Sequence, residues 1–303
     1  MVSAGTSSSP SDTAATLPDL FQVVQRYFLA NPCHAAVFVP ILRGEASEDY
    51  NLDNLRGISY THYARELEHI GRIFSQNFPS PRVSSPDKTC GYCKYSMEDK
   101  SHIELHGRLV NALVATQDAD TIVELRFILA VIIIHSLAHA FTDGNPVPMS
   151  KDDFPFYHSL YISPRKYIAE PGFFAEEGIF GGIIGIVFKE QENGLPPKFL
   201  EADFTRIAYL FLYDRTGTAY RLDTGELAGQ LKYHRFGQFK KARRIEVPRD
   251  ISERTCAAFN GDHLPIARVG AGRVPEWLEA ILAHGNLENI DDRFRHECVP
   301  ILE

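Results

Sequence analysis

An unbroken run of eight apolar residues, positions 127–134, is followed by two histidines that stand four residues apart. Thr121 and Glu124 precede the run with the S/T-x-x-E spacing of a helix capping box, and the sequence Asp-Gly-Asn-Pro follows it as a stop signal. The pattern predicts a helix from about Thr121 to Phe141. Because this helix is apolar nearly all round, we expect it to be buried in the middle of a domain.

Shorter apolar runs predict the elements around this helix. Apolar residues at helical spacing predict helices at 20–29, 63–78, 171–180 and 275–284. Short apolar runs predict strands at 35–42, 157–162, 183–188, 207–213, 218–222 and 231–234, and a strand that leads into a helix at 103–113. Residues 79–90 are rich in Pro and Ser and are expected to form a loop. The mixture predicts an α+β fold.

The length of 303 residues suits one large domain or two closely packed ones. Residues 1–17 are rich in Ser, Thr and Ala and are expected to form a disordered tail. A Gly/Pro break near 194–197 divides the remainder. We therefore expect a first domain at 18–194, which contains the central helix, and a C-terminal α+β subdomain at 195–303 packed on it.

Charge and cysteine content limit the classes of protein to which the chain could belong. The chain has 31 basic and 39 acidic residues, and its net charge of -8 argues against a general nucleic-acid binder. No apolar stretch is expected to reach the length of a membrane span, because charged residues and histidines interrupt the central helix. The N-terminus lacks the pattern of a secretory signal, and five cysteines give no disulfide framework. We expect a cytoplasmic protein with reduced thiols.

The two histidines, His135 and His139, carry the candidate chemistry. A helix places them one turn apart on one face, which is the geometry of a two-histidine metal site. In so apolar a helix the imidazoles need partners, because an unpaired buried polar group costs on the order of 1–3 kcal/mol. Zinc or another divalent metal is the expected occupant, because imidazole nitrogen is a suitable ligand for it. Satisfied core histidines without a metal are the alternative.

The sequence HSLAH at 135–139 resembles HELAH, a form of the zincin motif H-E-x-x-H. Downstream, the segment AEPGFFAEEGIFGG resembles the GE-x-G … LE … FGG signature of fungal proteins that carry HELAH, so the resemblance covers roughly residues 100–190. It implies a zincin-like fold of the gluzincin type, in which a glutamate from a second helix is the third metal ligand. The matching positions here include Glu170, Gly172 and Glu176.

The third ligand stays open among Glu170, Glu176 and Glu177, of which Glu177 looks the more exposed neighbour of Glu176. Gly172 lies one turn before Glu176, where a missing side chain would let the two helices approach closely, and this favours Glu176. Glu170 precedes a proline at the mouth of the helix. Partners for the imidazoles outside the ligand set are expected among Asp143, Asp152 and Asp153, by sequence proximity alone.

Ser136 occupies the catalytic position of the motif, where zincins have a glutamate that takes a proton from the metal-bound water. Serine has neither a suitable pKa nor the reach for this step, so ordinary peptide hydrolysis is not expected. A metal could still polarise a carbonyl or hold an enolate. Glu177 is a candidate substitute base.

Three functions follow from these observations. The first is a metal-dependent enzyme that performs Lewis-acid chemistry, such as a cyclisation, isomerisation or elimination, on a small-molecule or peptide-derived substrate. The second is a pseudo-peptidase that binds a peptide or protein partner without turnover. The third is a structural domain without a metal. None of them calls for a nucleic-acid or membrane partner.

Three further patterns are weaker. Cys90, Cys93, His102 and His106 have a zinc-finger-like order with a short loop, and the two histidines could share a helical face. Residues 232–244 interleave basic and aromatic side chains, for which a solvated surface is the preferred interpretation over an anion-binding patch. Oxyanion donors could come from Tyr157, His158 and Tyr161.

Overall fold

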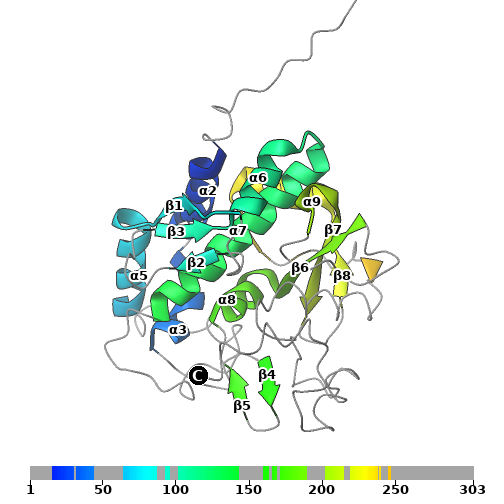
Figure 1. The fold of residues 1–303 in the computed structure, drawn as a ribbon. Helices are drawn as coiled ribbons and strands as arrows, with labels where there is room; N and C mark the ends of the chain where they lie inside the picture. Colours follow the sequence, from blue (N-terminus) through cyan, green and yellow to red (C-terminus); the bar gives the residue numbers. More distant parts are fainter. Residues whose placement is uncertain are drawn as a thin grey trace, which may run out of the picture.

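The computed structural model describes about half of the sequence, and its described part is mixed helix and strand (Figure 1). The described residues are 16–30, 32–43, 64–86, 93–95, 102–142, 160–163, 166–168, 171–189, 202–214, 219–237, 239 and 245–246. The α+β class predicted from the sequence is confirmed for these residues.

The predicted central helix is α7, Ala119–Thr142. It begins two residues before Thr121 because Asp118 caps it: Oδ2 of Asp118 accepts hydrogen bonds from the backbone N–H of Thr121 at 2.9 Å and from its hydroxyl at 2.6 Å. Thr121 and Glu124 lie inside the helix and are buried, so the predicted capping box is wrong. These hydrogen bonds from Thr121 hold the pKa of Asp118 below its usual range.

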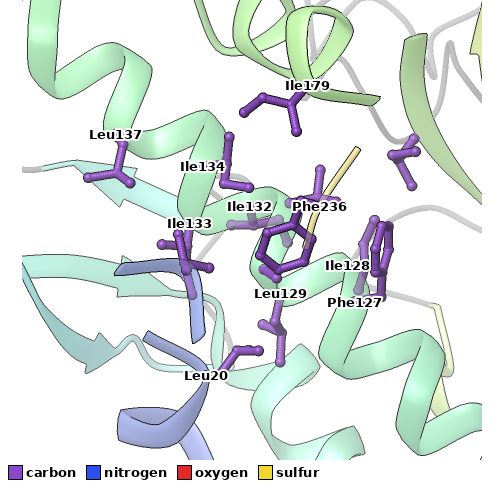
Figure 2. Packing of buried hydrophobic residues seen from close by; sticks show 14 of the residues in the cluster. Leu20, Phe127, Ile128, Leu129, Ile132, Ile133, Ile134, Leu137, Ile179 and Phe236 are labelled. Carbon is purple, nitrogen blue, oxygen red and sulfur yellow. The ribbon is translucent and has the colours of Figure 1, made fainter. Parts of the chain in front are cut away.

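Helices surround α7 on several sides, as Figure 1 shows. They are α2 (Thr16–Ala30), α3 (Val39–Arg43), α5 (Ala64–Gln76), α6 (Gly107–Ala115), α8 (Pro171–Phe180) and α9 (Thr224–Tyr233). Phe127, Leu129 and Ile133 of α7 have no exposed surface, and Leu20, Ile179 and Phe236 belong to the same core cluster (Figure 2). Burial of this apolar surface is the main stabilising contribution to the fold.

A four-stranded antiparallel sheet, ordered β6-β7-β8-β9, lies beside helices α8 and α9. Its strands are β6 (Gly182–Phe188), β7 (Ile207–Asp214), β8 (Ala219–Arg221) and β9 (Ile245–Glu246). Every residue of β6 is buried, and Gly185 pairs directly with Phe211. Strand β6 therefore connects α8 to the sheet through the core.

Two smaller sheets complete the described structure. In the first, β3 (His102–Leu105) pairs in parallel with β1 (Ser80–Val83) and antiparallel with β2 (Cys93–Tyr95). The second is the antiparallel pair β4 (Leu160–Ser163) and β5 (Lys166–Ile168). Strand β1 lies within 79–90, so the loop predicted there is wrong for residues 80–83.

Two predicted strands are wrong. Residues 35–42 belong to a 3-10 helix, η1 (Pro32–Phe38), followed by α3. Val37, Phe38, Val39 and Ile41 are all buried, so the run shows no alternation that would distinguish a strand from a buried helical segment. Residues 231–233 form the end of α9, and His234 ends this helix with a positive φ of 50°.

The other described predictions agree with the structure within a few residues. The helices at 20–29, 63–78 and 171–180 correspond to α2, α5 and α8, and the segment at 103–113 to β3 and α6. The strands at 183–188, 207–213 and 218–222 correspond to β6, β7 and β8, and β4 overlaps 157–162. The break at 194–197 and the helix at 275–284 lie outside the described residues. Strands β6 and β7, on either side of that break, pair in one sheet.

By length and composition, α7 could cross a membrane, and it is the one such helix in the described part of the chain. The expectation that no stretch reaches this length was therefore wrong. Core helices can meet the same criterion, and 78% of its most apolar 18-residue window is buried inside the protein. Core packing accounts for its apolar character.

Candidate metal centre

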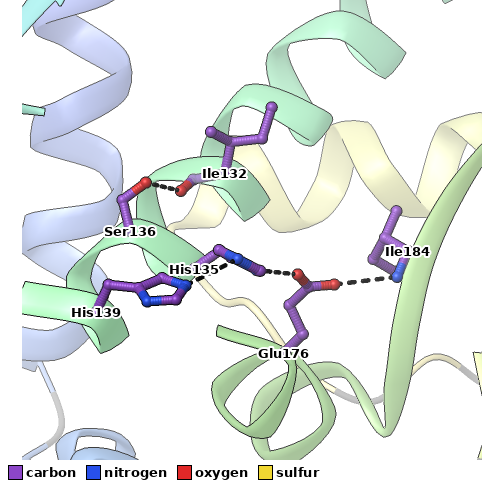
Figure 3. Close-up of polar contacts among 6 residues, drawn as sticks. All are labelled: Ile132, His135, Ser136, His139, Glu176 and Ile184. Carbon is purple, nitrogen blue, oxygen red and sulfur yellow. Dashed lines mark hydrogen bonds and ion pairs between the residues drawn. The ribbon is translucent and has the colours of Figure 1, made fainter. Parts of the chain in front are cut away.

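His135 and His139 are on the part of α7 that is not enclosed by the core. Between 127 and 141 only these two side chains and Ala140 are partly exposed, and the side chain of His135 is 21% exposed. Their Nε2 atoms lie 3.3 Å apart (Figure 3). The helix thus brings two nitrogen atoms together at a place that solvent can reach, as the spacing predicted.

Glu176 of α8 meets the other nitrogen of His135. Its Oε1 lies 2.8 Å from Nδ1 of His135, and its Oε2 accepts a hydrogen bond from the backbone N–H of Ile184 at 3.2 Å. The Glu176 side chain is buried, and Figure 3 shows Ile184, Glu176, His135 and His139 as a continuous polar chain. Because a carboxylate only accepts hydrogen bonds, this contact places a proton on Nδ1 of His135.

Gly172 allows α8 to come this close. A β-carbon at residue 172 would lie 2.3 Å from Cε1 and Nδ1 of His135, which is closer than real atoms approach. The predicted close approach of the two helices at Gly172 is therefore confirmed. Pro171 begins α8, where its missing N–H costs no helical hydrogen bond.

A tight turn brings the anchoring amide to Glu176. Gly181 follows α8 with a φ of 81°, a left-handed conformation that glycine adopts without strain. The chain then runs back as β6, so Ile184 lies beside the helix that precedes it. The end of this helix at residue 180 was predicted from the sequence. The hydrogen bond from Ile184 was not, because a backbone donor has no signal in the sequence.

Ser136 lies in the core instead of beside the two imidazoles. Its side chain has no exposed surface, and its hydroxyl donates to the carbonyl of Ile132 at 2.8 Å, away from Glu176 in Figure 3. This is the backbone hydrogen bond that a helical serine makes to the preceding turn. A catalytic role for Ser136 stays a prediction.

Several other predicted site residues cannot be placed. Glu170, Asp143, Asp152, Asp153, Tyr157, His158 and Cys90 lie outside the described residues, and of Glu177 and Tyr161 only the backbone is described. The proposed roles of these residues stay predictions.

The second predicted zinc site has a different geometry from the one expected. His102 begins β3, whereas His106 precedes α6 and caps it, with Nδ1 accepting from the backbone N–H of Arg108 at 3.2 Å. The two histidines therefore do not share a helical face. Cys93 is in β2, in register with Leu105.

Two aromatic residues of 232–244, Phe236 and Phe239, contribute to the core. Phe236 and Phe239 are buried, and their rings contact those of Phe127 and Phe180. They are therefore not a platform on which nucleic-acid bases stack. Tyr233, in contrast, is 63% exposed.

Besides Glu176 of α8, a second carboxyl is buried: Glu124 of α7. Burial raises the pKa of Glu124 to about 7, and the negative charge of Asp120 contributes further, while the positive charge of Arg221 opposes the shift. Glu124 lies three turns before His135 on the same helix.

The donor set fits a metal in part. Within the described ranges no three His, Cys, Asp or Glu side chains are arranged to hold a metal, because Glu176 contacts the far nitrogen of His135. The two Nε2 atoms nevertheless have the separation of two zinc ligands: a Zn–N distance of 2.0–2.1 Å and a tetrahedral angle give about 3.3 Å. Two imidazoles are suitable zinc ligands.

Comparison of the chain with protein-family models, with curated proteins and with solved structures found no match.

Proposed function

We propose that the protein is a metal-dependent enzyme on a zincin-like scaffold, in which His135 and His139 bind zinc or another divalent metal and Lewis-acid chemistry replaces peptide hydrolysis. The observation that carries the proposal is the 3.3 Å separation of the two Nε2 atoms on a partly exposed face of a core helix. The scaffold is supported by α8, which packs against α7 with Gly172 at the contact and brings a glutamate to the histidines.

The chemistry follows from the side chains around the pair. A bound divalent metal would polarise a carbonyl or phosphoryl oxygen of the substrate. His135 and His139 would hold it, and the exposure of the imidazoles gives a substrate access. Ser136 offers no proton acceptor there, since its hydroxyl is buried and donates to Ile132. This favours a cyclisation, isomerisation or elimination on a small-molecule or peptide-derived substrate.

One observation favours a second candidate, a structural role without a metal. The N–H of Ile184, the carboxylate of Glu176 and the imidazoles of His135 and His139 form a chain of contacts of 3.2, 2.8 and 3.3 Å. In this candidate Nε2 of His139 carries a proton and donates a hydrogen bond to Nε2 of His135. Both imidazoles then have partners without any ion.

Metal analysis of the full chain separates the two candidates. We expect about one equivalent of zinc in the wild-type protein and its loss in His135→Ala/His139→Ala, while His69→Ala, at an exposed position of α5, keeps the zinc. Zinc that survives in the double variant would direct attention to Cys90, Cys93, His102 and His106. Absence of zinc from every sample after supplementation would support the structural role.

A second measurement tests whether the metal has an open coordination position. The zinc is replaced by Co²⁺, whose visible absorption depends on its ligands, and acetohydroxamate is added as a small oxygen-donor probe. A shifted spectrum indicates a position that a substrate can occupy, as catalytic zinc sites have. An unchanged spectrum indicates a closed structural site and contradicts the enzyme.

A further inference from the structure

We infer that Glu176 is a positioning residue rather than the third metal ligand: it holds His135 as the Nδ1–H tautomer, so that the Nε2 lone pair points toward His139. The consequence for metal binding rests on the proposed function. The tautomer itself is a property of the protein without a metal, and it can be measured separately.

The hydrogen-bond geometry supports this role. The imidazole has two nitrogen atoms, and Oε1 of Glu176 lies 2.8 Å from Nδ1, whereas Nε2 of His139 lies 3.3 Å from Nε2 of His135. A carboxylate accepts and does not donate, so it selects the tautomer with a proton on Nδ1. A carboxylate that bound a metal between the Nε2 atoms would have to leave Nδ1.

The carboxylate of Glu176 has a second hydrogen-bond partner, on its other oxygen atom. Its Oε2 accepts from the backbone N–H of Ile184 at 3.2 Å, and the turn at Gly181 brings that amide back onto α8. The Glu176 side chain is 5% exposed, so water does not readily replace either partner. The amide of Ile184 is part of the fully buried strand β6 and gives the carboxylate a fixed position.

The ring of His135 is held in the same orientation by its packing. Gly172 leaves only enough space for the imidazole, as a β-carbon there would lie 2.3–2.4 Å from three ring atoms. A half-turn of the ring about the Cβ–Cγ bond would exchange Nδ1 for Cδ2 and would break the hydrogen bond to Glu176. Packing therefore fixes the plane of the ring, and the hydrogen bond to Glu176 selects one of its two flipped orientations and one tautomer.

A carboxylate on the outer nitrogen also raises the basicity of the ligating nitrogen. Partners of this kind typically change metal affinity about 10–100-fold when they are removed. Loss of a direct ligand, by contrast, would abolish stoichiometric binding at the concentrations at which the wild type is saturated. A positioning role and a ligand role for Glu176 thus predict different metal affinities once the carboxylate is removed.

Glu176→Gln is the informative substitution because glutamine has only one acceptor oxygen for two donors. The backbone N–H of Ile184 cannot change its protonation, whereas the imidazole can. We expect the glutamine oxygen to accept from Ile184 and its NH₂ group to donate to Nδ1 of His135. His135 then becomes the Nε2–H tautomer, and its lone pair no longer faces His139.

Long-range ¹H–¹⁵N correlation spectra of the metal-free, full-length protein measure the tautomer directly. The chain has 12 histidines, and His135 is identified by the signals missing from His135→Ala. We expect Nδ1–H in the wild type, Nε2–H in Glu176→Gln, and no change in Glu68→Gln, which removes one exposed carboxylate from α5. A wild-type His135 with its proton on Nε2 would overturn the inference, even if Glu176→Gln did not fold.

Zinc titration of the same proteins is the second experiment. We expect Glu176→Gln to bind one equivalent with a Kd raised about 10–100-fold, and Glu68→Gln to bind as the wild type does. Complete loss of stoichiometric binding in Glu176→Gln, as in the histidine variants, would identify Glu176 as a direct ligand and overturn the inference. If no protein binds zinc, the proposed function fails, and the tautomer spectra still decide the role of Glu176.

Discussion

A β-carbon at residue 172 would lie 2.3 Å from both Cε1 and Nδ1 of His135, so the backbone of Gly172 and the imidazole are in direct contact. At this point α8 meets α7, and the carboxylate of Glu176 reaches the ring one helical turn later. The absence of a side chain at one position thus determines whether the two helices can share a polar site.

Gly172→Ala is expected to separate the two helices or displace the ring of His135. Both responses break the contact with Glu176, and overpacking of this kind costs about 1–3 kcal/mol. Urea unfolding would measure the loss in free energy of unfolding, and zinc titration would show weaker binding.

Gly71→Ala is the matched control for this substitution. Position 71 is in α5, and a β-carbon there meets nothing within 4 Å. Alanine is favoured over glycine in a helix by about 1 kcal/mol, so this variant should be slightly more stable than the wild type. Equal effects of the two substitutions would contradict the steric argument at Gly172.

Ser136→Glu would restore the zincin motif in sequence, but we expect it to destabilise the protein. Position 136 has no exposed surface, and an unpaired carboxylate there costs on the order of 3 kcal/mol. Thermal unfolding would show a lowered Tm, whereas Ser136→Ala should change it little, since it removes one helix-internal hydrogen bond. A stable Ser136→Glu protein with peptidase activity would mean that residue 136 faces the metal centre instead.

Glu124 is expected to make stability depend on pH. Its pKa is raised from 4.5 to about 7 in the folded protein, so the folded state binds more protons than the unfolded state between these values. The stabilisation is fully present below about pH 4.5 and is lost as the pH rises through about 7. The difference should be on the order of 2 kcal/mol in the free energy of unfolding.

Glu124→Gln tests this assignment, because glutamine stays neutral at every pH. Urea unfolding between pH 5 and 8 should show a decline for the wild type and for the exposed control Glu68→Gln, and little decline for Glu124→Gln. Above pH 7 the Glu124→Gln protein should be the most stable of the three. The same slope in all three proteins would contradict the raised pKa.

Substitutions at Gly185 and Phe211, in the four-stranded sheet, are expected to have coupled effects on stability. These residues pair across β6 and β7, and a β-carbon at 185 would lie 2.3 Å from Cζ of Phe211. Phe211 is fully buried, so its ring has no space to move, and Gly185→Ala should cost about 1–3 kcal/mol. The cost should fall in a Phe211→Leu background, and a double-mutant cycle by urea unfolding measures this.

The sequence predicts those parts of the fold whose signals are local. The helix at 171–180 has Pro at its start and Gly-Gly after its end, and the structure has α8 at Pro171–Phe180. A strand was predicted at 231–234, whereas residues 231–233 are the end of a helix whose start signal lies upstream. Asp223 caps α9 by accepting from the backbone N–H of Glu226, and this Asp-x-x-Glu spacing was visible in the sequence.

The site is only partly predictable for a physical reason. The spacing of His135 and His139 is a property of one helix, so their proximity follows from the sequence. The contact of Glu176 with Nδ1 depends on how α8 packs against α7 and on an amide of β6, which are tertiary relationships. The burial of Ser136 likewise depends on which face of α7 the other helices cover.

Helix α7 contacts α2, α3, α6, α8 and α9 and reaches strands of two separate sheets. Because so many elements pack against α7, unwinding of this helix would disrupt the remainder of the described fold. The two imidazoles are therefore mounted on a helix that packs against many other elements, so capture of an ion there would sacrifice little conformational freedom. Selectivity among metal ions would then be set by how well each ion matches a fixed pair of nitrogen atoms.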